Sequence, residues 1–94
     1  MKYKQFDAVI VHWNDAWKNS RAKFTTEEAI EFGSRTCTSH TAGFIVDKND
    51  DRIILTQHYN DQDSGDKLCS DVLNIPMSLV TQIEKFVKTK KSKK

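Results

Sequence analysis

Apolar and polar positions along this chain form several short periodic stretches. Residues 6–13 fit an extended strand rich in β-branched side chains. Val9 and Val11 share one face of this strand, while Ile10 lies on the other. Because both faces are apolar, we expect the strand to lie inside a sheet.

A helix start follows at residue 25. Thr25 is placed to accept a hydrogen bond from the backbone of Glu28, whose carboxylate is placed to reach back to the Thr25 backbone. This is the pattern of a capping box. Phe24 is expected to pack against Ala29 as a hydrophobic staple.

The predicted helix covers residues 26–32. Gly33 follows it, where a left-handed residue commonly ends a helix. A helix of about two turns is too short to persist alone. We therefore expect Ile30 and Phe32 to dock on the sheet.

The firmest strand prediction is a hairpin in the middle of the chain. Residues 36–47 read as one long strand that Gly43 interrupts with a bulge or a sharp bend. Residues 47–51, Asp-Lys-Asn-Asp-Asp, supply turn chemistry, and residues 52–57 return as the partner strand.

The last third of the chain is less regular. Residues 59–66 are predicted to be a polar loop, and residues 67–75 a strand that Pro76 ends. From residue 77 two interpretations stay open. Apolar spacing at residues 79–87 favours a helix, whereas a barrel would need a 3₁₀ turn at residues 77–79 and a closing strand through Ile83.

These elements predict an α+β, mostly β, fold. It is a small five-stranded antiparallel barrel with one short helix between the first two strands. With 94 residues, the chain is long enough for one modestly stable domain that self-association would help. We assign residues 1–87 to this domain and residues 88–94 to a disordered lysine-rich tail.

Charge separates the body of the chain from its tail. The sequence has 15 Lys and Arg against 13 Asp and Glu, a formal net charge of +2. Six of those lysines lie at residues 85–94, so the nine basic and thirteen acidic residues of 1–84 give the body a charge of −4. Lysine runs of this kind are usually solvated, and less often bind nucleic acid or anionic lipid.

Cysteine usage and hydropathy point to a reducing compartment. Cys37 and Cys69 are too few for a disulfide scaffold, and the first residues do not fit a signal peptide or a membrane span. We expect free thiols that fill the core as small residues, a cytoplasmic location and no membrane partner.

No pattern in the sequence predicts a metal, a cofactor or catalysis. Cys37-x-x-His40 lacks the second paired ligand motif of a strong zinc site, even with Cys69, His12 and His58 elsewhere in the chain. The aspartate-rich loops depart from the calcium-binding pattern. Three isolated glycines make no phosphate loop, and no nucleophile stands beside a base. We therefore expect a protein that is not an enzyme.

The order of motifs resembles short accessory proteins of tailed bacteriophages. The residues that carry the resemblance are Val11-His12-Trp13, Asp15, Trp17, Glu27-Glu28-Ala29, Gly43-Phe44-Ile45-Val46, and Ile75-Pro76 through Ile83. The second half also resembles an Sm-like or SH3-like barrel. The resemblance covers about residues 6–86 and implies a small barrel that forms rings or dimers and binds RNA, nucleotides or peptides.

The best sequence candidates for ligand contact combine aromatic surface with positive charge. Stacking a base and neutralising a phosphate need those two properties. Hydroxyl and imidazole groups on the strand after the helix are expected to add polar contacts, although Trp17 also has a structural interpretation, packing under its loop. The predicted ligand-binding residues are Trp17, Lys18, Arg21, Lys23, Thr38 and His40.

The resemblance and the absence of catalytic groups favour a non-enzymatic binding protein. In a phage setting it would sequester a nucleotide signal or bind a host protein, and so counter host defence or metabolism. The alternative is an Sm-like binder of single-stranded RNA or DNA that uses the lysine tail for phosphate contacts.

Overall fold

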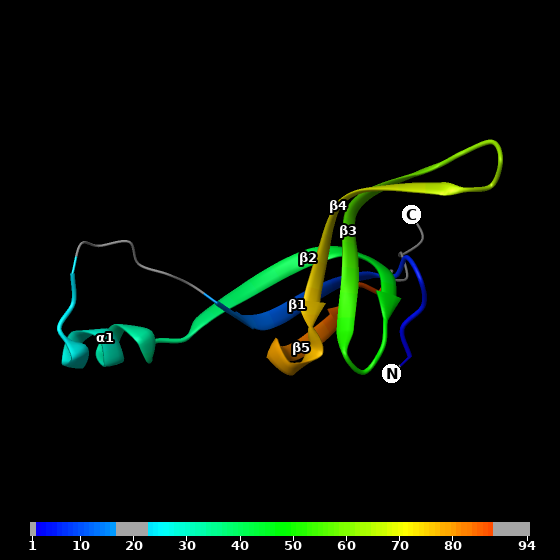
Figure 1. The fold of residues 1–94 in the computed structure, drawn as a ribbon. Coiled ribbons are helices and arrows are strands. Elements are labelled where there is room, and N and C mark those ends of the chain that lie inside the picture. The colour runs from blue at the N-terminus through cyan, green and yellow to red at the C-terminus, as the bar shows by residue number, and fades with distance from the viewer. Residues whose placement is uncertain (1, 17–22, 88–94) are drawn as a thin grey trace, which may run out of the picture.

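The structure, a computed structural model, describes residues 2–16 and 23–87. The described part of the chain is mostly β, with one α-helix, which confirms the coarse expectation of a mostly β, α+β fold (Figure 1). In chain order the elements are β1 (Ala8–Asp15), α1 (Thr26–Gly33), β2 (Cys37–Lys48), β3 (Arg52–Asp61), β4 (Lys67–Pro76), the 3₁₀ turn η1 (Met77–Leu79) and β5 (Val80–Lys85).

The five strands form one antiparallel sheet in the order β4-β3-β2-β1-β5. β1 pairs with β2 from Ala8↔Phe44 to Asp15↔Cys37, and its other side pairs with β5. The expected interior position of this strand is confirmed. Within the described residues β4 and β5 are the two ends of the strand order and are not paired with each other, so the sheet is not closed into a barrel.

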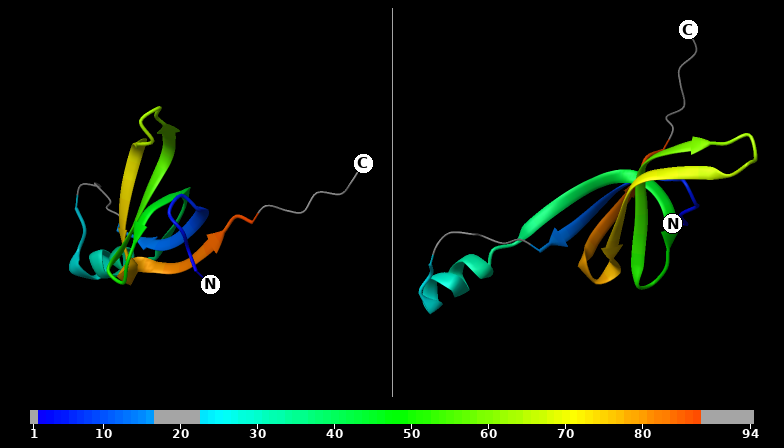
Figure 2. Two further views of the ribbon diagram at one scale, coloured as in Figure 1. Left: turned by 90° about the vertical axis from the view of Figure 1, so that its right-hand side faces the viewer. Right: turned by 45° about the horizontal axis from the view of Figure 1, so that its top comes forward.

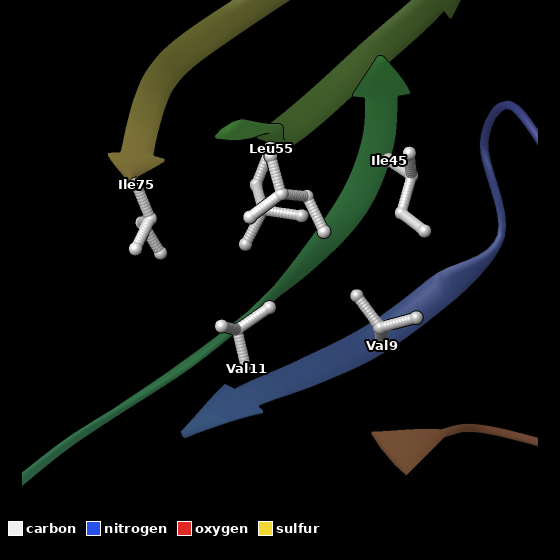
Figure 3. Close-up of a cluster of buried hydrophobic side chains, with 6 residues drawn as sticks. Val9, Val11, Ile45, Leu55 and Ile75 are labelled. Carbon is white, nitrogen blue, oxygen red and sulfur yellow. The ribbon is translucent and has the colours of Figure 1, made fainter. Parts of the chain in front are cut away.

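Successive side chains of a strand point to opposite faces of the sheet, and the apolar side chains gather on the inner face of this curved sheet. The buried side chains come from β1 to β4 and meet in a single cluster (Figure 3). Partly buried side chains on the margins, Trp13 among them, pack against this cluster. Trp13 Nε1 donates to Thr41 Oγ1 at 3.0 Å, so its polar atom has a partner. The buried core comprises Val9, Val11, Ile45, Ile53, Leu55 and Ile75.

The β2–β3 hairpin forms where the sequence predicted it. Asn49 Oδ1 accepts from the backbone N–H groups of Asp51 (2.8 Å) and Arg52 (3.0 Å), and Asn49 N–H donates to the Arg52 carbonyl. The asparagine side chain thus replaces a backbone acceptor in the turn.

The hairpins differ from the prediction in two places. β3 runs on to Asp61, so three of the residues assigned to a polar loop are strand; the turn covers only the tip, where Gly65 has φ 93°. These polar residues form strands although their sequence has no apolar pattern, because backbone hydrogen bonds between β3 and β4 hold the exposed end of this hairpin together. The predicted irregularity at Gly43 is also displaced, because the β2–β3 register shifts between Ile45 and Asp47.

The β3–β4 hairpin bends sharply between its base and its tip, as Figure 1 shows. The ladder passes from Thr56↔Val72 to His58↔Ser70, and the skipped Asp71 has φ 54°. The buried Thr56 hydroxyl donates to the Ser70 carbonyl (2.7 Å) and accepts from the Ser70 N–H (3.1 Å). At the bend, the Thr56 hydroxyl therefore makes hydrogen bonds that replace the missing backbone bonds between β3 and β4.

The capping box of α1 is confirmed. The Thr25 side chain accepts from the Glu28 N–H, and the Thr25 N–H donates to Glu28 Oε1 at 3.0 Å. The ring contact of Phe24 is with Phe32, 4.9 Å between centroids, one turn beyond the expected Ala29.

Two predictions about the helix are wrong. Gly33 is the last helical residue and not a left-handed cap; Ser34 follows in the right-handed region and its hydroxyl donates to the Ile30 carbonyl. α1 also does not dock, since none of its residues is buried and Ile30 is 64% exposed. β1 and β2 carry the helix out to the end of a long arm (Figure 2).

Because no residue of α1 is buried, its cap should have a large effect on its helicity. Thr25→Ala is expected to destabilise the helix by about 1 kcal/mol, seen as a loss of helical backbone chemical shifts at residues 26–33 by NMR. The Thr25 hydrogen bonds lower the pKa of the Glu28 carboxyl, so the cap is present at neutral pH and weakens as pH falls through that pKa. Thr36→Ala, at an exposed site outside the helix, should leave these shifts unchanged.

The C-terminal segment adopts the second of the two open interpretations, a 3₁₀ turn followed by β5. A bulge explains the misleading helical period. β5 pairs Gln82 with His12 and Val80 with Trp13, so Thr81 is an extra residue and apolar side chains three apart, Val80 and Ile83, both reach the core.

Candidate functional site

The predicted ligand-binding residues divide into three groups. Trp17, Lys18 and Arg21 lie outside the described residues. Lys23 is exposed and lies three residues before α1. Figure 1 shows α1 at the far end of the arm formed by β1 and β2. Only Thr38 and His40 lie together, on the same face of β2, where they pair with Asn14 and His12 of β1.

His40 belongs to a polar contact that the sequence did not predict. Its Nδ1 lies 2.6 Å from Nδ1 of His12, and Nε2 of His12 lies 2.5 Å from Glu84 Oε1. We call His12, His40 and Glu84 the histidine cluster. Its members come from three adjacent strands, β2, β1 and β5, and all lie on the face opposite the apolar core.

The Cys37-x-x-His40 spacing does not form a ligand pair in this fold. Both residues are in β2, and side chains three positions apart in a strand point to opposite faces. Cys37 and Cys69 are free and exposed, against the expectation that they fill the core. Among residues 2–16 and 23–87 there is no group of three or more His, Cys, Asp or Glu side chains arranged to hold a metal ion.

A second surface combines aromatic rings with a cation. Phe6 and Tyr59 have ring centroids 4.4 Å apart, and Phe44 meets Tyr59 edge-on at 5.0 Å. Lys67 Nζ lies 5.5 Å from the centroid of Phe6 and 5.6 Å from that of Tyr59. The same ammonium pairs with the Asp61 carboxylate, and this hydrogen bond raises the pKa of Lys67.

Of these side chains, Phe6 and Lys67 line a hollow of about 390 Å³, to which Val46 also contributes. We call this hollow and the rings beside it the aromatic groove. Phe6 reaches it from a backbone with φ 67°, anchored by its N–H to the Ile45 carbonyl at 2.6 Å. A positive φ is costly for an aromatic residue, which marks this position as one that the surrounding structure holds in place.

The charge around the aromatic groove is acidic. Three exposed aspartates, Asp61, Asp63 and Asp66, lie in the turn between β3 and β4 or at the strand end beside it. They outnumber the one cation of residues 61–67, Lys67. A phosphate group would meet more negative than positive charge there, whereas an ammonium or guanidinium group would meet both carboxylates and aromatic faces.

Sequence reasoning missed the aromatic groove because its parts are distant in the chain. Phe6 precedes the first strand, and Tyr59 was placed in a polar loop. A signal was nevertheless present: single aromatic residues in otherwise polar segments commonly have a packing or binding role.

No family model, curated protein or solved structure matches this chain. Among the described residues, none of the helical segments has the length and apolar character needed to span a bilayer. Function is therefore inferred from the geometry of the chain itself.

Proposed function

We propose that this chain is a non-enzymatic binding protein whose aromatic groove takes a basic segment of a partner protein. The observation that carries the proposal is Lys67, whose ammonium lies over two aromatic rings and against a carboxylate. The rings and the carboxylate thus form a cation-binding environment, in which a lysine or arginine of a partner would take the place of the Lys67 ammonium.

The energetics favour a cation over an anion. An ammonium or guanidinium over an aromatic face gains about 0.5–2 kcal/mol, depending on desolvation. The aspartates at the turn add attraction that steers a basic partner toward the groove. Nucleotide sequestration, one of the roles expected from the sequence, is less favoured at this surface because the phosphates would face these aspartates.

The resemblance to phage accessory proteins suggests that the partner is a host protein, bound in the bacterial cytoplasm. The finer fold assignment is part of the same proposal: the open sheet of the described residues corresponds to the sheet of an Sm-like or SH3-like barrel. Its support is the antiparallel order β4-β3-β2-β1-β5 with a 3₁₀ turn before the last strand.

Self-association through strand edges is also part of the proposal. β4 and β5 end the strand order, and β4 exposes Leu68 and Val72 while Phe86 is exposed just beyond β5. Exposed apolar side chains on an edge strand favour pairing with another chain. Single-stranded RNA or DNA stays the alternative ligand, with the lysine tail as its contact.

Fluorescence anisotropy with labelled peptides of one length tests the ligand class. We expect an arginine- and lysine-rich peptide to bind and a glutamate-rich peptide not to bind. Tyr59→Leu keeps an apolar side chain but removes the ring, and should weaken binding roughly 3- to 30-fold. Asp63→Asn should weaken it less, and the matched variant Asp50→Asn, in the other hairpin turn, should not change it.

An oligothymidylate of similar length supplies the contrary outcome. If it binds more tightly than the basic peptide, with a steep salt dependence, and Tyr59→Leu leaves both affinities unchanged, the aromatic groove is not the binding site and the nucleic-acid alternative takes its place.

A further inference from the structure

We propose that the histidine cluster binds a divalent transition-metal ion, with Nδ1 of His12 and Nδ1 of His40 as the two protein ligands. These residues are direct partners in the β1–β2 ladder, and their Nδ1 atoms face each other at 2.6 Å. The site is independent of the aromatic groove, which uses none of these side chains.

The backbone prearranges the two imidazoles. Both side chains project from adjacent paired strands on the face away from the core, so their Cα positions are fixed by the ladder. A metal–nitrogen bond of about 2.0–2.1 Å requires the two nitrogens to move slightly apart. The rings have room for this small rotation, because His40 is exposed and His12 only partly buried.

Glu84 sets the orientation of His12. Its Oε1 lies 2.5 Å from Nε2 of His12, on the side of the ring opposite His40. A carboxylate that accepts the Nε2–H leaves the Nδ1 lone pair of His12 free to face His40. This is the arrangement of a carboxylate–histidine–metal triad, in which the carboxylate fixes the tautomer and raises the basicity of the ligand.

Without metal, the same tautomer of His12 accepts a hydrogen bond from Nδ1–H of His40. A metal ion takes the place of that proton, and His40 then carries its proton on Nε2. No net proton is needed or released for neutral rings.

Two imidazoles with open positions suit copper, nickel and zinc. No third His, Cys, Asp or Glu in the described residues joins the pair, so water would complete the coordination. A site of this kind follows the general order of divalent affinities, with Cu²⁺ above Ni²⁺ and Zn²⁺.

Isothermal titration of the full chain with CuCl₂, NiCl₂ and ZnCl₂ tests the proposal. Cys37→Ser and Cys69→Ser are introduced first, so that thiolates do not contribute. We expect one ion per chain and a loss of at least about tenfold in affinity with His40→Gln. Glu84→Gln should lower the affinity about 10- to 100-fold, as for other carboxylates that orient metal-binding histidines.

His58→Gln is the matched control, since His58 is the third histidine of the sequence and bonds to Asn60 in β3. It should bind metal as the parent does. Circular dichroism verifies that each variant is folded, and Cu²⁺ electron paramagnetic resonance should show hyperfine coupling to two imidazole nitrogens that His40→Gln reduces to one. Equal affinity of the parent and folded His40→Gln, or loss of binding in His58→Gln, would overturn the proposal.

Discussion

Replacing Leu55 with alanine is expected to lower the free energy of unfolding by about 2–5 kcal/mol, through lost apolar burial and the cavity left behind. Leu55 is fully buried, and its strand β3 is paired on both sides, to β2 and to β4. The surrounding side chains are held by two ladders and have little freedom to collapse into the space. For a domain of this size, such a loss is a large part of the total stability.

Urea denaturation followed by tryptophan fluorescence measures the effect, since Trp13 packs at the edge of the core. Leu68→Ala is the matched control: the same chemical change in β4, at a side chain that is 56% exposed. It should change stability by no more than about 0.5 kcal/mol. Similar losses in the two variants would mean that the core is not where the structure places it.

Local signals predicted the parts of the fold that depend on neighbours in sequence. The Thr25–Glu28 capping box needs only residues three apart, and the turn at Asn49 needs only its own side chain and the next three residues. Both formed as expected. The interior position of β1 also followed from its own apolar pattern.

The left-handed cap at Gly33 was a local prediction that failed, but the larger errors depended on contacts between distant segments. Docking of Ile30 required the helix to lie on the sheet, and the length of the arm that carries it was not visible in the pattern. At Thr81 in β5 the missed contact is present and not absent. Pairing with β1 creates a bulge there, and the extra residue gives the apolar side chains of a strand the spacing of a 3.6-residue helical period.

The candidate sites show the same limit. His40 was expected to contact a ligand, but its partner His12 is 28 residues away, and Glu84 is 72 residues from His12. Only the register of three strands brings them together. Tyr59 and Phe6 likewise meet through the bend of the β3–β4 hairpin and a strained backbone, which no local pattern encodes.

The second large effect is expected at Gly43, where the sequence predicted an interruption of β2. The strand is continuous there, and the glycine instead allows a close approach. A Cβ atom at residue 43 would lie 3.0 Å from the Thr56 carbonyl oxygen and 3.3 Å from Leu55 Cβ. Because the nearest atom is backbone in a paired strand, it is not free to move aside. We expect Gly43→Ala to destabilise the protein by about 1–3 kcal/mol, as overpacking does.

Gly33→Ala is the control that separates this contact from the general effect of adding a methyl group. Gly33 is the last residue of α1, its φ is not positive, and a Cβ atom added there would meet nothing within 4 Å beyond its own helix and chain neighbours. Alanine there should be neutral or stabilise the helix by up to about 1 kcal/mol. In the same urea series Gly43→Ala should therefore lower the free energy of unfolding, whereas Gly33→Ala should leave it unchanged or raise it. Equal and small shifts would mean that β2 and β3 are not as close at Gly43 as the structure has them.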